Sequence, residues 1–264
     1  GHTGFKGSWL TIWLNQLGCD VVGISLEPQT VPSLFEITNT AKQCASHIID
    51  IGDLEAINSV VEGEKPEVVF HLAAQALVYQ SYEKPLDTFS TNVMGTVNLL
   101  ESLRLVGSSS SVVMVTSDKV YRNDGTSQPY VESDALGGKD PYSASKAAAE
   151  LIIASYRHAF LEEHGVAIAT ARAGNVIGGG DWASSRLIPD AIRAWSNNQS
   201  LEVRNPHSIR PWQHVLEPLY GYLLLAQKLA LNPSAAGAYN FGPNAESSHS
   251  VGDVIELAKG KWSG

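Results

Sequence analysis

The first ten residues, GHTGFKGSWL, carry glycines at Gly1, Gly4 and Gly7 directly before a segment of helical periodicity. Glycines at this spacing permit a tight turn and let the backbone approach a pyrophosphate, whose charge is favoured at a helix N-terminus. We therefore predict a dinucleotide-binding turn that includes the backbone of Phe5 and Lys6. Such turns normally follow a strand, and we interpret the sequence as a fragment that lacks this first strand. A glycine-rich turn without chemical consequence is the alternative.

Short apolar runs alternate with longer segments of helical periodicity behind this turn. The expected buried strands cover residues 21–26, 67–72, 111–116 and 166–170, and the expected helices, the first beginning near Ser8, cover 9–17, 54–61, 86–106 and 142–164. This alternation predicts an α/β fold of the Rossmann type, in which helices cover both faces of a doubly wound parallel sheet.

The rhythm of the sequence changes at the glycine-rich bend of residues 178–180. Shorter segments follow this bend, with helices expected at 188–195 and 216–231. We therefore predict a dinucleotide-binding Rossmann domain over residues 1–177 and a smaller substrate-binding region over residues 178–264, with some segments able to return to the sheet. We also expect this region to lack its C-terminal end.

Composition excludes several classes of function. Hydrophobic residues make up 44% of the 264 residues, which is enough for a sizeable core. The net charge of −9 provides no basic footprint for nucleic acid. Two cysteines, Cys19 and Cys44, are too few for a disulfide framework and favour a cytoplasmic location. Because no apolar run reaches about 18 residues, we expect no membrane partner.

The second apolar run, VVGIS, ends at Ser25, where the ribose of a bound dinucleotide would lie. An aspartate there would indicate NAD, so Ser25 alone leaves NAD and NADP open, and the lack of a nearby arginine for a 2′-phosphate favours NAD. Asp50 and Ile51 follow another short apolar run and could reach the adenine, although an isolated acid is more typical of a solvated loop.

The segment FHLAAQ passes from a buried strand into small residues. Leu72, Ala73 and Ala74 would let a cofactor approach the backbone, although packing at a strand end is an equally good interpretation. His71 is more typical of a core or cofactor-side histidine than of a metal ligand, because no second ligand has suitable spacing. We therefore predict no metal site.

Candidate catalytic residues stand in VTSDKVY and DPYSASK. The first stretch places Ser117, Asp118 and Lys119 at the carboxyl edge of the sheet, where ligands of open α/β sheets bind. Tyr142 and Lys146 share a helix face in the second stretch. An ammonium beside a phenol stabilises the phenolate, which would make Tyr142 a usable base near neutrality. Taken alone, this pair is usually no more than one helix turn.

Together these motifs resemble the extended short-chain dehydrogenases/reductases. The residues shared with that superfamily are Gly1, Gly4, Gly7, Tyr142, Lys146 and the Asn92 of TNVMGTVNLLE, which would also contact the cofactor. TSDK and RPWQHVLEPL are more discriminating, and together with RAGNVIGGGDWA and RLIPD they are similar to the CDP-glucose 4,6-dehydratase family. The resemblance covers nearly the whole chain. It implies a tightly held NAD, oxidation of the sugar at C4, loss of water across C5 and C6, and hydride return to C6.

The resemblance also implies roles for individual residues. Tyr142 would remove the O4 proton, Lys146 would bind the nicotinamide ribose and tune Tyr142, and Ser117 would hydrogen-bond near O4. Asp118 would protonate the departing C6 hydroxyl. Lys119 stands where related dTDP-glucose dehydratases have a glutamate base, and whether it removes the C5 proton or stabilises an enolate stays open.

The resemblance further implies how substrate and subunits are bound. The substrate-binding residues would be Gln75, Asn175, Arg186, Arg204 and Arg210, with the arginines neutralising the diphosphate of CDP-glucose. The helices at 86–106 and 144–164 would pair in a homodimer or higher homo-oligomer, although their apolar faces could equally belong to the core. The alternatives are a nucleotide-sugar 4-epimerase, another nucleotide-sugar 4,6-dehydratase or, remotely, a non-catalytic NAD-binding protein.

Overall fold

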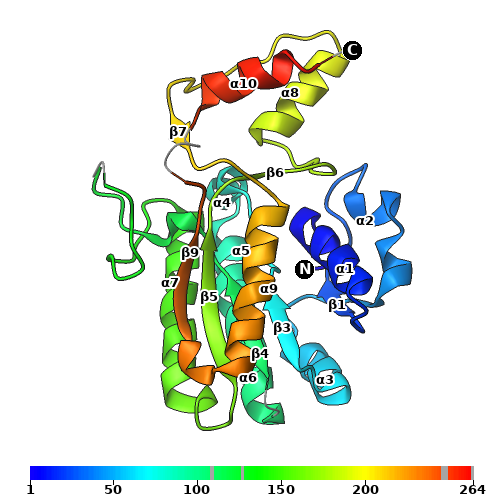
Figure 1. Cartoon of the computed structure of the whole chain (residues 1–264), viewed down its shortest axis with the longest axis vertical. Coiled ribbons are helices and arrows are strands. Elements are labelled where there is room, and N and C mark those ends of the chain that lie inside the picture. The colour runs from blue at the N-terminus through cyan, green and yellow to red at the C-terminus, as the bar shows by residue number, and fades with distance from the viewer. Residues whose placement is uncertain (108–109, 126–127, 245–248, 263–264) are drawn as a thin grey trace.

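The computed structural model describes residues 1–107, 110–125, 128–244 and 249–262 (Figure 1). Its main sheet has four parallel strands in the order β3, β4, β5 and β9. Their bounds are Val68–His71, Ser111–Val115, Ala167–Ala173 and Gly237–Phe241. A separate parallel pair joins β1 (Val22–Ser25) to β2 (Ala45–Ile48). Two further short pairs join β6 (Val176–Ile177) to β8 (Gln213–His214) and β7 (Ile209–Arg210) to β10 (His249–Ser250).

Helices connect these strands. The α-helices are α1 (Phe5–Gln16), α2 (Leu34–Ile37), α3 (Leu54–Glu64), α4 (Val78–Glu83), α5 (Pro85–Phe89), α6 (Gly95–Val106), α7 (Pro141–Tyr156), α8 (Leu187–Ser196), α9 (Leu216–Leu231) and α10 (Val251–Lys259). The π-helical turns are η2 (Ser90–Met94) and η4 (Arg157–Leu161), and the 3₁₀ turns are η1 (Thr40–Gln43), η3 (Asp118–Val120) and η5 (Pro233–Ala235). None of the described helices is both long and apolar enough to cross a membrane.

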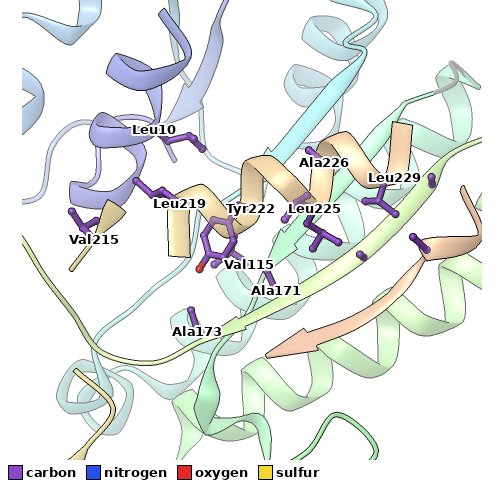
Figure 2. Packing of buried hydrophobic residues seen from close by; sticks show 14 residues of the cluster. Leu10, Val115, Ala171, Ala173, Val215, Leu219, Tyr222, Leu225, Ala226 and Leu229 are labelled. Atoms are coloured by element: carbon purple, nitrogen blue, oxygen red, sulfur yellow. The ribbon is translucent and has the colours of Figure 1, made fainter. Parts of the chain in front are cut away.

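The sheet separates two hydrophobic cores, because successive side chains of a strand point to opposite faces. Val113 and Val115 of β4 belong to one core with Leu10 of α1 and Leu219 and Leu229 of α9. Figure 2 shows this core from close by, with the ring of Tyr222 among the strand residues. The other core lies on the opposite face and contains Val112, Met114, Leu100, Leu103 and Ile153, from β4, α6 and α7. Helices on both faces complete the doubly wound α/β arrangement that the sequence predicts.

The helix that carries the Tyr–Lys pair begins at a strong local signal. Asp140 precedes α7 in an extended conformation, and its Oδ1 accepts a hydrogen bond from the Ser143 amide at 2.9 Å. Pro141 occupies the first helical position, where its missing N–H costs nothing. The cap therefore fixes where Tyr142 lies, in the first turn beside the end of the sheet.

The predicted strands are confirmed in position, and several boundaries differ. Helix α1 begins at Phe5 rather than near Ser8, because Gly4 already has the extended backbone of an N-cap. The pattern at 86–106 forms α5 and α6 joined by the π-helical turn η2, and the pattern at 142–164 ends in η4. Strand β2 was not predicted.

Residues 178–264 contribute to two places in the fold. Strand β9 pairs with β5, and α9 packs on β4 and β5, so these segments return to the main sheet. Helices α8 and α10 pack together at one end of the molecule, beyond the sheet (Figure 1). The division into domains at residue 177 stays a prediction.

Candidate active site

The glycine turn packs against the end of β3. A Cβ atom added at Gly1 would lie 2.6 Å from the Ala73 amide nitrogen, and one added at Gly7 would collide with the Gly1 carbonyl oxygen. Gly4 has no side chain with which to cap α1, so the first-turn N–H groups depend on another acceptor. These features fit the pyrophosphate of a dinucleotide, which needs a close backbone and free N–H groups.

Ser117 and Asp118 follow β4 at the carboxyl edge of the sheet. The Ser117 hydroxyl donates to Asp118 Oδ1 at 3.1 Å and accepts from the Lys119 amide at 3.2 Å. The Asp118 carboxyl lies beside Gly174, because a Cβ atom there would be 3.3 Å from Asp118 Oδ2. The same added Cβ atom would lie 2.8 Å from the ring of Pro211, so the segment at residues 210–212 also reaches this edge.

Tyr142 is buried at the same edge, with 8% of its surface exposed. Burial raises the pKa of its phenol, while a hydrogen bond with Ser117 acts in the opposite direction. The negative charge of Asp118 also raises this pKa, and the positive charge of Arg186 lowers it. Ser117, Asp118 and Arg186 therefore lie near Tyr142, and their joint role in one active site stays a prediction.

Lys146 lies one helix turn after Tyr142, and its side chain reaches the last residue of β4. Its Nζ donates to the Val115 carbonyl oxygen at 3.3 Å. Burial lowers the pKa of Lys146 to about 8, and the opposing influence is the carboxylate of Glu150. The ammonium thus sits at the end of β4, and its action on Tyr142 stays a prediction.

Lys6, a predicted cofactor residue of the glycine turn, also extends its side chain toward this site. Its Nζ lies 5.9 Å from the centre of the Tyr222 ring. Burial and the nearby charge of Arg186 lower the pKa of Lys6 to about 8, and Asp118 opposes this change. The sequence signal for this role is the position of Lys6 inside a glycine turn, where an apolar residue would pack more easily than a charged one.

Asn92 acts within the protein scaffold. Its side-chain oxygen accepts from the Gln75 amide at 2.8 Å, and its amide nitrogen donates to the Gln75 carbonyl at 3.0 Å and to the Ser145 hydroxyl at 2.9 Å. These bonds join η2, the end of β3 and α7. Any contact of Asn92 or Gln75 with a cofactor or substrate stays a prediction.

The other predicted cofactor residues have different environments. The Ser25 hydroxyl, at the end of β1, pairs with the Thr3 hydroxyl at 2.8 Å. Asp50 is exposed and accepts from the Gly52 amide at 2.7 Å. The side chain of Ile51 is buried in the core, which leaves only its backbone for a ligand. Leu72, Ala73 and Ala74 follow β3 beside the glycine turn and are half-buried.

The predicted substrate residues are dispersed. Arg186 pairs with Asp181 at 2.9 Å near the reaction edge, and Asn175 is half-buried after β5. Arg204 and Arg210 are exposed in the outer part, and neither forms a salt bridge within the described chain. Lys119 is also exposed, although its neighbours Ser117 and Asp118 are not.

A Tyr–Lys pair at the carboxyl edge of a doubly wound sheet, facing a glycine turn, is the arrangement of the extended short-chain dehydrogenases/reductases. The sequence profile of GDP-mannose 4,6 dehydratase matches residues 1–262. The chain therefore belongs to the GDP-mannose 4,6 dehydratase family.

Known proteins resemble the chain over nearly its whole length. It is 51% identical to the CDP-glucose 4,6-dehydratase of Salmonella typhimurium, over 99% of this chain and 75% of the relative. The UDP-glucose 4-epimerase of Thermotoga maritima, solved with UDP-glucose, matches 98% of this chain and 80% of its own at a TM-score of 0.83 and 21% identity. The dTDP-glucose 4,6-dehydratase of Bacillus anthracis, solved with NAD, matches 100% of this chain and 80% of its own, with a TM-score of 0.80 and 22% identity. At such identities the two structures show the fold alone.

Proposed function

We propose that the protein dehydrates CDP-D-glucose to CDP-4-dehydro-6-deoxy-D-glucose with a bound NAD, as an NAD-dependent hydro-lyase. The observation that carries this proposal is the 51% identity with a CDP-glucose 4,6-dehydratase over 99% of the chain. The Ser117-Asp118 tip beside Tyr142 and Lys146 supports it, because a dehydratase needs acid–base groups in addition to a redox base.

NAD fits the residues of the site. The glycine turn would hold its pyrophosphate, and Ser25 would lie near the adenosine ribose. When bound, NAD supplies the acceptor and donor of the hydride. The structure supports this assignment through the contact of Gly1 with Ala73 and the collision that any side chain at Gly7 would cause.

In the first half of the reaction, Tyr142 would remove the proton from the sugar O4. Its phenol needs help to ionise, because burial raises its pKa. The hydrogen bond with Ser117 and the positive charge of Arg186 lower this pKa, and the ammonium of Lys146, one helix turn away, would provide further help. Ser117 would also hold O4 in line for this transfer.

In the second half, Asp118 would donate a proton to the departing C6 hydroxyl. Oxidation at C4 makes the C5 proton acidic, and Lys119 would remove it or stabilise the resulting enolate. Arg186 would neutralise the diphosphate near the reaction edge, and Asn175, Arg204 and Arg210 would complete the nucleotide-sugar contacts.

The substrate test incubates the NAD-loaded protein separately with CDP-, dTDP- and GDP-glucose and compares the rates of conversion. We expect a 4-keto-6-deoxy sugar from CDP-glucose, with a kcat/KM at least about a hundredfold above the other two, because mispaired polar groups in a base pocket reduce binding steeply. Mass spectrometry detects the loss of water, and NMR identifies the C6 methyl group. Formation of the C4 epimer without loss of water would instead identify a 4-epimerase, and no conversion would overturn both assignments.

We also propose a homodimer or higher homo-oligomer in the cytoplasm, where free thiols such as Cys19 and Cys44 persist. Helix α7 contacts α5 and α6, and all three helices expose large apolar side chains. The most exposed are Leu86, Leu151 and Leu105, at 82%, 62% and 54%. A second copy of this chain would bury them across a two-fold axis.

The oligomer is tested by placing charges on this face. We expect the pair Leu86→Glu and Leu151→Glu to shift sedimentation from dimer to monomer, because two buried carboxylates oppose association. Leu231→Glu is the matched control, since Leu231 is 81% exposed on α9, across the sheet. A wild-type protein that sediments as a monomer at micromolar concentration would contradict the proposal.

A further inference from the structure

Glu150 is a buried carboxylate one helix turn after Lys146. It is 3% exposed, and its two oxygens accept a forked pair from Arg172 of β5. Arg172 Nε donates to Oε1 at 3.0 Å and Nη2 donates to Oε2 at 2.8 Å. Tyr142, Lys146 and Glu150 therefore follow one another at four-residue intervals along one side of α7.

Two threonine hydroxyls complete the surroundings of this carboxylate. Thr116 donates to Oε1 at 2.5 Å and Thr170 donates to Oε2 at 2.9 Å. Thr116 stands between Val115, whose carbonyl accepts from Lys146, and Ser117, the partner of Tyr142. One carboxylate thus ties α7 to the residue that directly follows β4 and lies between Val115 and Ser117.

Arg172 extends the network away from α7. Its Nη1 donates to the Tyr121 hydroxyl at 2.9 Å and to the Glu132 carbonyl oxygen at 3.0 Å. The Tyr121 hydroxyl in turn donates to the Asn240 side chain on β9 at 2.6 Å. The network therefore spans α7, β4, β5 and β9, and its polar groups are paired.

A buried ion pair is weak as a source of stability, because taking two charges out of water costs about as much as their attraction returns. The place of this pair indicates another use. The charged and titratable groups near Lys146 are Glu150 on the same side of α7, Lys6 of α1 and His71 of β3, and Arg172 of β5 pairs with Glu150 behind them. Burial lowers the pKa of His71 to about 3, which leaves it neutral. Glu150 is thus the carboxylate that favours the Lys146 ammonium.

We propose that Glu150 is a positioning residue for the Tyr142–Lys146 pair: it holds α7 in register with the end of β4 and keeps a negative charge facing Lys146. Through Lys146 it maintains the ammonium that an ionised Tyr142 requires. This inference rests on the proposed function, because it assigns Glu150 to the redox base of that reaction.

The test compares Glu150→Gln, Arg172→Gln and the double variant Glu150→Gln/Arg172→Gln. The double variant retains volume and hydrogen bonding without burying an unpaired charge, so it is expected to fold when the single variants do not. The first readout is the pH profile for reduction of bound NAD by CDP-glucose. Because Glu150 raises the pKa of Lys146, its loss should move the alkaline limb down by about one pH unit in Glu150→Gln, and by less in the double variant, which also removes the positive charge of Arg172. Arg172→Gln should not move it down.

A second readout needs no substrate. Competitive acetylation followed by mass spectrometry measures the pH at which Lys146 becomes reactive, with the exposed Lys119 as an internal control. We expect the midpoint pH of Lys146 to fall by about one unit, a tenfold rise in proton concentration, in Glu150→Gln and by less in the double variant, while the midpoint of Lys119 stays constant. A shift in a protein that does not convert CDP-glucose would support the inference while rejecting the proposed function. Unchanged midpoints in a folded double variant would overturn the inference.

Discussion

Replacement of Tyr142 by phenylalanine should reduce the rate of sugar oxidation at C4 by about a thousandfold while leaving CDP-glucose and NAD bound. The phenol is the proposed acceptor of the O4 proton, and general base catalysis contributes about this much. The ring is buried and stays in the variant, so α7 should keep its place. Stopped-flow absorbance of reduced NAD measures the oxidation, and calorimetry measures binding.

The same substitution elsewhere on α7 provides the control. Tyr156 ends the helix, and its hydroxyl donates to Glu101 at 3.3 Å, away from the reaction edge. Tyr156→Phe should therefore oxidise CDP-glucose at the wild-type rate. A Tyr142→Phe protein that retains more than about a tenth of that rate would contradict the assignment of the base.

Most of the fold could be predicted because its signals are local. Strand β4 is an almost wholly apolar buried run, β5 is fully buried and apolar apart from Thr170 and Arg172, and β3 has an apolar run although only His71 is buried. Strand β2, in which every residue is half-buried or exposed, carries no such signal. The π-helical turn η2 within the pattern at 86–106 was also not predicted, since π turns are rare and occur mostly as single turns inside α-helices.

The site was predictable where consecutive residues lie at the same carboxyl edge of the sheet, as Ser117 and Asp118 do. The buried partners of Glu150 were not predictable, because Thr116, Thr170 and Arg172 come from two strands whose register only the fold defines. Lys6 shows the same limit. Its position in the glycine turn was clear, whereas its proximity to Asp118 and Arg186 joins three segments that are far apart in the sequence.

Asp118→Asn and Lys119→Ala should each allow oxidation at C4 and lower dehydration by about 100- to 10,000-fold, the range for loss of a general acid or base. The two variants should differ in one measurement. In deuterium oxide, Lys119→Ala should fail to incorporate deuterium at C5, because the C5 proton is not removed. Asp118→Asn should still exchange that proton, because only the departure of the C6 hydroxyl is impaired. Mass spectrometry of the recovered sugar distinguishes these outcomes.

Lys139→Ala is the matched control for Lys119→Ala, because Lys139 is exposed and near in sequence. It should dehydrate CDP-glucose at the wild-type rate. Undiminished exchange at C5 in Lys119→Ala would contradict the assignment of the base. The amine to test next would then be that of Lys6, because a lysine can accept a proton only when neutral. Burial lowers the pKa of Lys6 to about 8, and Asp118 lies close enough to influence it. Loss of C5 exchange in Lys6→Met, with oxidation at C4 retained, would identify Lys6 as the base beside the acid Asp118.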